Sequence, residues 1–201
     1  MDDRFFDRLK ALYAPPENQF TVVDVPPLRF LVIEGTGDPA GGGIAEANKW
    51  LWSIAFFLLP LAKERMEEKF AYPPLECQFW TDDPQGFRAG TRDKWHWRVM
   101  VILADWMTED MIDKAIARAE EKRGSKAPPT LGIDDLKEGK SVQIMHVGTY
   151  DEVRAICDRL YGEFLPGHDL TPNGRYHEIY LNDPSRTMRE KRKIVIRQPV
   201  E

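Results

Sequence analysis

One stretch near the C-terminus predicts a short strand of alternating character: Gly174-Arg175-Tyr176-His177-Glu178-Ile179-Tyr180-Leu181-Asn182-Asp183-Pro184. Because successive side chains of a strand point to opposite sides, Tyr176, Glu178 and Tyr180 share one face. His177 and Ile179 share the other face. A half-buried strand ordinarily keeps Glu on its solvent side. The acidic face is therefore either the lining of a pocket for a flat, cationic or electron-poor molecule, or a tyrosine-bearing surface.

The elements around this strand predict an α+β fold built from two similar halves. In the first half the pattern predicts strands over 20–25 and 30–34, a helix over 45–70, strands over 75–81 and 95–104, and a helix over 108–123. In the second half it predicts a strand over 141–147, a helix over 151–164, and strands over 176–181 and 193–197. A short helix over 4–13 precedes both.

Helix periodicity and capping signals support these assignments. The helix over 151–164 carries an apolar stripe with helical spacing: Val153, Ile156, Cys157, Leu160, Tyr161 and Phe164. Thr149 with Glu152 three residues later is typical of a capping box, and Thr108 is typical of an N-cap.

A weak internal echo favours duplication. The motif Gly35-Thr36-Gly37-Asp38 follows the first strand of one half, and Gly148-Thr149-Tyr150-Asp151 follows that of the other. We therefore expect duplicated β-α-β-β repeats with pseudo-twofold symmetry, antiparallel sheets covered by two long helices, and a ligand groove between the halves. The expected divisions are an N-terminal helix over 1–18 and a domain over 19–201, with repeats over 19–124 and 141–199 and a linker over 125–140.

Bulk properties exclude several classes of protein. The chain has 201 residues and a net charge of −5, which argues against nucleic-acid binding. The N-terminus lacks a signal-peptide pattern, and the most apolar stretch, Trp50 to Ala62, is too short to span a membrane. Cys77 and Cys157 are isolated, so a reduced cytoplasmic protein is expected. The glycines over 35–43 match no phosphate-binding motif and favour a turn.

Aromatic and acidic residues on neighbouring predicted strands suggest a cage. The candidates besides the strand over 176–181 are Glu76, Trp80, Trp95, Trp97 and Tyr150. Such cages bind cations and planar rings. For any one tryptophan ordinary core packing is the favoured interpretation, whereas the set taken together favours a pocket. A carboxylate beside aromatic rings can also act as a general acid or base. The four histidines have no metal-ligand spacing, so no metal and no cofactor are expected.

The order of these motifs resembles the GyrI-like small-molecule-binding superfamily, which includes the effector-binding domains of AraC-type and MerR-type multidrug regulators. The matching segments are 148–150, 176–184 and 196–199. The first half resembles a stand-alone subfamily through Pro73-Pro74-Leu75-Glu76 and Trp95-His96-Trp97. That subfamily usually reads Leu-Glu-Gly-Leu-Trp-Trp where this chain has Leu75-Glu76-Cys77-Gln78-Phe79-Trp80.

The resemblance implies a ligand groove in which Glu178 is the acidic residue that attracts cationic lipophilic drugs. It also implies that some stand-alone members hydrolyse cyclopropane-bearing alkylating compounds. Catalytic roles are then expected for Glu178 and Tyr150, and ligand contacts for Glu76, Trp80, Trp95, Trp97, Tyr176 and Tyr180.

Three functions remain open from sequence: a xenobiotic-binding module, a hydrolase of strained electrophiles, and a protein-interaction role by analogy with the family's namesake. The expected partner is a small molecule, with no nucleic acid and no membrane, and the protein is a monomer or homodimer. About 18 residues precede the predicted domain, too few for a DNA-binding helix-turn-helix.

Overall fold

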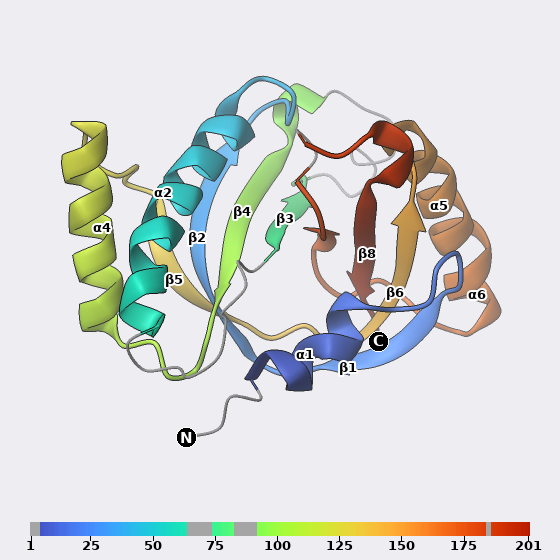
Figure 1. The fold of residues 1–201 in the computed structure, drawn as a ribbon. Coiled ribbons are helices and arrows are strands. Elements are labelled where there is room, and N and C mark those ends of the chain that lie inside the picture. The colour runs from blue at the N-terminus through green and yellow to red at the C-terminus, as the bar shows by residue number, and fades with distance from the viewer. Residues whose placement is uncertain (1–4, 64–73, 83–91, 184–185) are drawn as a thin grey trace. The chain divides into compact units, whose positions relative to one another are not determined.

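The computed structural model describes residues 5–63, 74–82, 92–183 and 186–201, with the side chains of residues 5–8 left out (Figure 1). The fold is α+β, and every described pairing between its strands is antiparallel. The chain forms two compact units. Unit 1 takes residues 1–7, 28–75 and 79–136, and unit 2 takes residues 8–27, 76–78 and 137–201.

Unit 1 is a sheet with helices packed on one face. Its strands pair in the order β4 (His96–Leu103), β2 (Leu28–Thr36) and β5 (Leu131–Leu136). Ile33 of the central strand β2 lies between Val99 of β4 and Leu131 of β5. Helix α2 (Gly43–Lys63) packs on β2 and β4, and α4 (Glu109–Arg123) packs against α2 (Figure 1). The apolar stripe of α2 makes this packing possible, because Trp50, Leu51, Ile54 and Leu58 are buried.

Both ends of α4 are capped, and the N-terminal cap is the predicted residue Thr108. The Thr108 hydroxyl accepts a hydrogen bond from the Met111 N–H at 3.3 Å. Gly124 adopts a left-handed conformation with φ 64° and closes the C-terminus. A short helix η1 (Arg92–Lys94) precedes β4, and β3 (Leu75–Trp80) contributes residues to both units.

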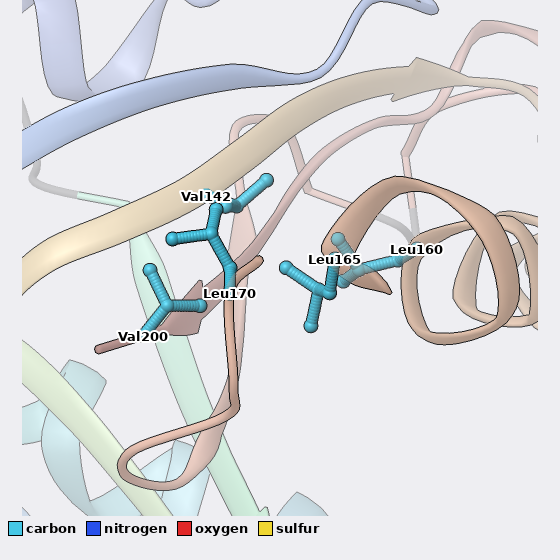
Figure 2. Close-up of a cluster of buried hydrophobic side chains, with 5 residues drawn as sticks. All are labelled: Val142, Leu160, Leu165, Leu170 and Val200. Atoms are coloured by element: carbon cyan, nitrogen blue, oxygen red, sulfur yellow. The ribbon is translucent and has the colours of Figure 1, made fainter. Parts of the chain in front are cut away.

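Unit 2 pairs its strands in the order β1 (Thr21–Val25), β6 (Gly139–Val147), β8 (Lys193–Pro199) and β7 (Tyr176–Tyr180). The helical segment after β6 runs through η2 (Tyr150–Glu152), α5 (Val153–Arg159), the π-helical turn η3 (Leu160–Phe164) and α6 (Leu165–Gly167). Its apolar residues meet the sheet in a buried cluster, shown in Figure 2: Val142, Leu160, Leu165, Leu170 and Val200.

The register of unit 2 defines two faces. His177 lies opposite Arg197, and Glu178 lies opposite Ile196. Because paired residues of antiparallel strands point to the same side, His177 and Arg197 share one face and Glu178 shares the other with Ile196. Helix α1 (Phe5–Tyr13) covers the His177 face, since the Arg197 guanidinium donates to the Leu12 carbonyl at 2.9 Å. The Glu178 face carries α5.

The predicted elements agree with the structure apart from one strand and several boundaries. The chain orders β2-α2-β3-β4 and β6-α5-β7-β8 both follow the expected β-α-β-β pattern. Residues 131–136, expected within a linker, form β5, and β1 groups with unit 2 although it was expected in the first repeat. The predicted end of the helix near residue 70 lies outside the described residues. Duplication and pseudo-twofold symmetry stay predictions.

Among the described residues, no helix combines the length and the apolar character needed to cross a bilayer.

Candidate functional site

Glu178 is held by two tyrosines of its own strand. It is half-buried on β7, and each of its carboxylate oxygens accepts one hydrogen bond. The Tyr176 hydroxyl donates to Oε1 at 2.8 Å, and the Tyr180 hydroxyl donates to Oε2 at 2.5 Å. The i±2 spacing places all three on one face, so the alternation of the sequence accounts for this arrangement.

Two thiols border this carboxylate. The Cys157 Sγ–H of α5 donates to the Tyr176 hydroxyl at 3.6 Å, which places α5 on the Glu178 face. Burial, followed by the charge of Glu178, raises the pKa of Cys77 well above its ordinary value. Burial likewise raises the pKa of Cys157 to about 11. Both therefore remain thiols at neutral pH, and neither is an activated nucleophile.

Tyr150 extends the cluster toward solvent. Its ring meets that of Tyr180 edge-on, with centroids 6.1 Å apart and planes at 76°. The side chain is 41% exposed, and the Arg192 guanidinium carbon lies 5.3 Å from its ring centroid. We name Glu178, Tyr176, Tyr180 and Tyr150 the Glu178–tyrosine cluster.

Electrostatics keep these phenols protonated. Burial, followed by the charge of Glu178, raises the pKa of Tyr176 and of Tyr180 well above 10.0. Burial and Glu178 also raise the pKa of Tyr150 to about 12, although Arg192 opposes the shift. All three hydroxyls are thus hydrogen-bond donors near neutral pH, and the cluster combines one carboxylate with phenolic donors and aromatic faces.

A second polar network occupies the opposite face of β7. The His177 imidazole is fully buried, with Nε2 3.0 Å from Glu76 Oε2 and Nδ1 2.9 Å from Glu138 Oε1. Glu138 Oε2 also accepts from the Arg197 guanidinium at 3.0 Å. The Tyr13 hydroxyl of α1 donates to Glu76 Oε1 at 2.7 Å. These five side chains, named the His177 network, bring two acids, two bases and a phenol together.

The buried charges of the His177 network stabilise one another. Burial alone lowers the pKa of His177, but the charge and hydrogen bond of Glu138, together with the close contact to Glu76, outweigh it and raise that pKa to about 9. Burial disfavours the Glu138 carboxylate, yet His177 and Arg197 lower its pKa to about 2. His177 and Glu138 are therefore both charged at neutral pH.

Glu76 belongs to this network and not to the Glu178–tyrosine cluster. His177 alternates with Glu178 along β7, so Glu76 and Glu178 lie on opposite sides of that strand. Cys77, the next residue along β3, is instead the one whose thiol is affected by the charge of Glu178 and by a hydrogen bond to Tyr180. β3 is buried along both faces from Leu75 to Phe79, so its sequence gave no signal for which side meets Glu178.

The three candidate tryptophans lie in unit 1 and do not form one cluster there. Trp97 is buried on the α2 side of its sheet, where a Cβ added to Gly35 would lie 2.2 Å from its ring. Trp80 stacks on His96 with centroids 5.5 Å apart. His96 and Trp97 are consecutive in β4, so Trp80 and Trp97 lie on opposite faces. Trp95 lies 6.0 Å from the Phe79 ring.

Unit 1 also contains a small apolar cavity of about 20 Å³ under α2, which is room for about one water molecule. Its lining residues are Leu31, Leu51, Ala55, Leu58, Leu59, Val101, Ile102, Leu103 and Met107. No polar side chain in this lining could orient a ligand, so the cavity is a weaker candidate than the Glu178–tyrosine cluster. Within the described ranges, no group of three or more potential ligand side chains could hold a metal ion.

Sequence reasoning missed Tyr13, Glu138 and Arg192. Tyr13 and Glu138 lie 63 and 39 residues from their partners Glu76 and His177, so no local pattern could reveal them. Arg192 belongs to the charged segment Arg189-Glu190-Lys191-Arg192-Lys193, and nothing in that segment distinguishes it from the other basic residues.

Comparison with known proteins agrees with this fold. A crystal structure of an uncharacterized conserved protein from Listeria innocua matches with a TM-score of 0.84 and 29% identity over 98% of each chain. A hydrolase from Listeria innocua matches with a TM-score of 0.79 and 28% identity, again over 98% of each chain. The EcmrR C-terminal domain shares the fold with a TM-score of 0.53 and 12% identity, covering 91% of this chain and 97% of that one.

No curated protein matches the chain. The family model described as the GyrI-like small molecule binding domain matches residues 18–200, which is nearly the whole sequence. The chain therefore belongs to the GyrI-like small-molecule-binding family.

Proposed function

We propose that the protein binds hydrophobic, often cationic or planar, small molecules at the Glu178–tyrosine cluster. The observation that carries this proposal is the half-buried Glu178 carboxylate, fixed by the Tyr176 and Tyr180 hydroxyls and flanked by their rings. A carboxylate with aromatic walls attracts a delocalised cation through both charge and cation–π contact. Family membership supports small-molecule binding in general, and Glu178 supplies the selectivity for charge.

A titration with the methyl ester of rhodamine B, a lipophilic cation with a planar xanthene ring system, tests this proposal. We expect saturable binding by fluorescence anisotropy, weakened at least about tenfold, or about 1.4 kcal/mol, in Glu178→Gln. The matched control is Glu163→Gln, which removes an exposed carboxylate from η3 of the same unit and should bind like wild type. Equal affinity of Glu178→Gln and wild type would contradict the proposal.

A second candidate function is hydrolysis of strained, cyclopropane-bearing electrophiles at the same cluster. Two observations favour it: the 28% identity to a Listeria innocua hydrolase over 98% of each chain, and the Tyr150 phenol, which stays a proton donor beside Glu178. In this hypothesis the Glu178 carboxylate takes a proton from a water molecule while the oxygen of that water attacks the cyclopropane carbon. The breaking C–C bond sends its electron pair into a conjugated carbonyl, whose oxygen Tyr150 protonates.

Mass spectrometry separates turnover from binding. Incubation with a cyclopropane-bearing alkylating compound should yield several product molecules per protein, each heavier by one water. Tyr150→Phe should abolish this turnover while retaining affinity for the rhodamine ester. Recovery of unchanged compound with wild-type protein would leave binding as the function for that substrate.

A further inference from the structure

Arg192 places a positive charge beside an acidic site. Its guanidinium carbon lies 5.3 Å from the Tyr150 ring centroid, and the side chain is half-buried. Its backbone carbonyl accepts a hydrogen bond from the Gly148 N–H at 2.9 Å, two residues before Tyr150. The backbone thus fixes the segment that carries Arg192 to the segment that carries Tyr150.

Successive contacts link a negative charge, two aromatic rings and a positive charge in one row: Glu178, Tyr180, Tyr150 and Arg192. Glu178 accepts from the Tyr180 hydroxyl at 2.5 Å, and the Tyr180 ring meets the Tyr150 ring at 6.1 Å. The Arg192 guanidinium then lies over Tyr150. The charges at both ends of this row act on Tyr150, because Glu178 raises the pKa of its hydroxyl while Arg192 lowers it.

Such a row discriminates between ligands of different charge pattern. A monocation lying along the rings is attracted by Glu178 but repelled by Arg192. Because the site is partly buried, solvent ions screen both interactions only weakly. A planar molecule with a cation at one end and a carboxylate at the other gains at both ends. Arginine is well suited to the second contact, since its planar fork binds a carboxylate through two parallel hydrogen bonds.

We propose that Arg192 is a specificity-determining residue of the Glu178–tyrosine cluster, selecting planar zwitterions over planar monocations. The zwitterion's cationic end contacts Glu178, its ring system contacts Tyr180 and Tyr150, and its carboxylate pairs with Arg192. This assignment rests on the proposed function, because it names the ligand class for the same site.

Rhodamine B and its methyl ester form a matched pair of probes. They share one ring system, but the free acid is a zwitterion at neutral pH and the ester is a monocation. We expect wild type to bind rhodamine B about tenfold more tightly than the ester. Arg192→Gln should bind rhodamine B more weakly and the ester more tightly than wild type does, so that the preference for rhodamine B disappears or inverts. Arg192→Lys should retain part of the preference, because it keeps the charge and loses the fork.

Lys191→Gln is the control, since it removes an exposed positive charge from the neighbouring residue and should leave the preference unchanged. An Arg192→Gln variant that changes both affinities by the same factor, or a wild type with no preference, overturns the assignment. Failure of the proposed function looks different: then neither dye binds saturably, or Glu178→Gln binds both dyes as wild type does.

Discussion

At the scale of single residues, Glu178 shows how a strand can hold a carboxylate ready for a ligand. The tyrosines two positions before and after it each donate one hydroxyl to it, so its position does not depend on distant elements. Hydrogen bonds to a charged acceptor are stronger than neutral ones. The two hydroxyls thus fix the orientation of the carboxylate, and under the proposed function this would lower the ordering cost of binding.

Removing one of these hydroxyls tests that description. Tyr180→Phe keeps the ring but deletes the 2.5 Å hydrogen bond to Glu178. We expect a loss of about 1.5–3 kcal/mol in the free energy of unfolding, because the bond reaches a charged, half-buried group. Urea denaturation measures this loss. Tyr150→Phe is the control: no hydrogen bond of its hydroxyl occurs among the described residues, so a loss within about 0.5 kcal/mol is expected. Equal losses in the two variants would contradict this reading.

At the scale of elements, the fit between β2, β4 and α2 depends on glycine. The Trp97 ring of β4 lies over Gly35 of β2 and over Gly43 at the start of α2. A Cβ at Gly35 would lie 2.2 Å from the ring, and one at Gly43 would lie 2.7 Å from it. Since Trp97 is buried, neither side of this contact can yield without moving an element.

Gly35→Ala should therefore destabilise the protein by about 1–3 kcal/mol through overpacking. It should also change the near-ultraviolet circular dichroism of the tryptophans, because the indole must move. Gly132→Ala, in β5 of the same unit, is the matched control: its new Cβ would meet no atom within 4 Å. An unfolding free energy for Gly35→Ala equal to that of Gly132→Ala would show that the indole moves freely.

Periodicity explains which elements could be predicted. The alternation of β7 grouped Tyr176, Glu178 and Tyr180, and the structure joins them by hydrogen bonds. β5 could not be predicted because its surroundings are typical of a linker: Pro128 and Pro129 precede it, Gly132 lies within it and Gly139 follows it. Alternation of polar and apolar residues shows which side of a strand faces the core only when the other side faces solvent. β3 is buried on both sides from Leu75 to Phe79, so it has no such alternation. The sequence therefore does not show that Glu76 and Glu178 lie on opposite sides of β7.

At the scale of the whole chain, the His177 network gathers side chains from distant positions into unit 2. Tyr13 comes from α1, Glu76 from β3, Glu138 from the turn before β6, His177 from β7 and Arg197 from β8. The network combines two acids with two bases. Loss of the His177 proton would leave the buried Glu138 carboxylate with Arg197 as its one remaining positive partner in the network, so folding and protonation are coupled.

The sign of this coupling follows from the two shifted pKa values. The pKa of His177 is raised from 6.5 to about 9, so its contribution to stability is complete below pH 6.5 and is lost as the pH rises through 9. The pKa of Glu138 is lowered from 4.5 to about 2, so its contribution is complete above pH 4.5 and is lost as the pH falls through 2. Both contributions are complete between these limits.

We therefore expect the melting temperature to fall as the pH is raised from 6.5 toward 10. His177→Gln should be less stable at pH 6 and should lose much of this slope, since glutamine carries no proton to release. His146→Gln replaces another buried histidine, one outside the His177 network, and should keep the slope. A direct readout follows from the imidazole resonance of His177, which should titrate near pH 9. A midpoint near 6.5 would show instead that Glu76 and Glu138 do not hold the proton, and the coupling between this network and folding would be absent.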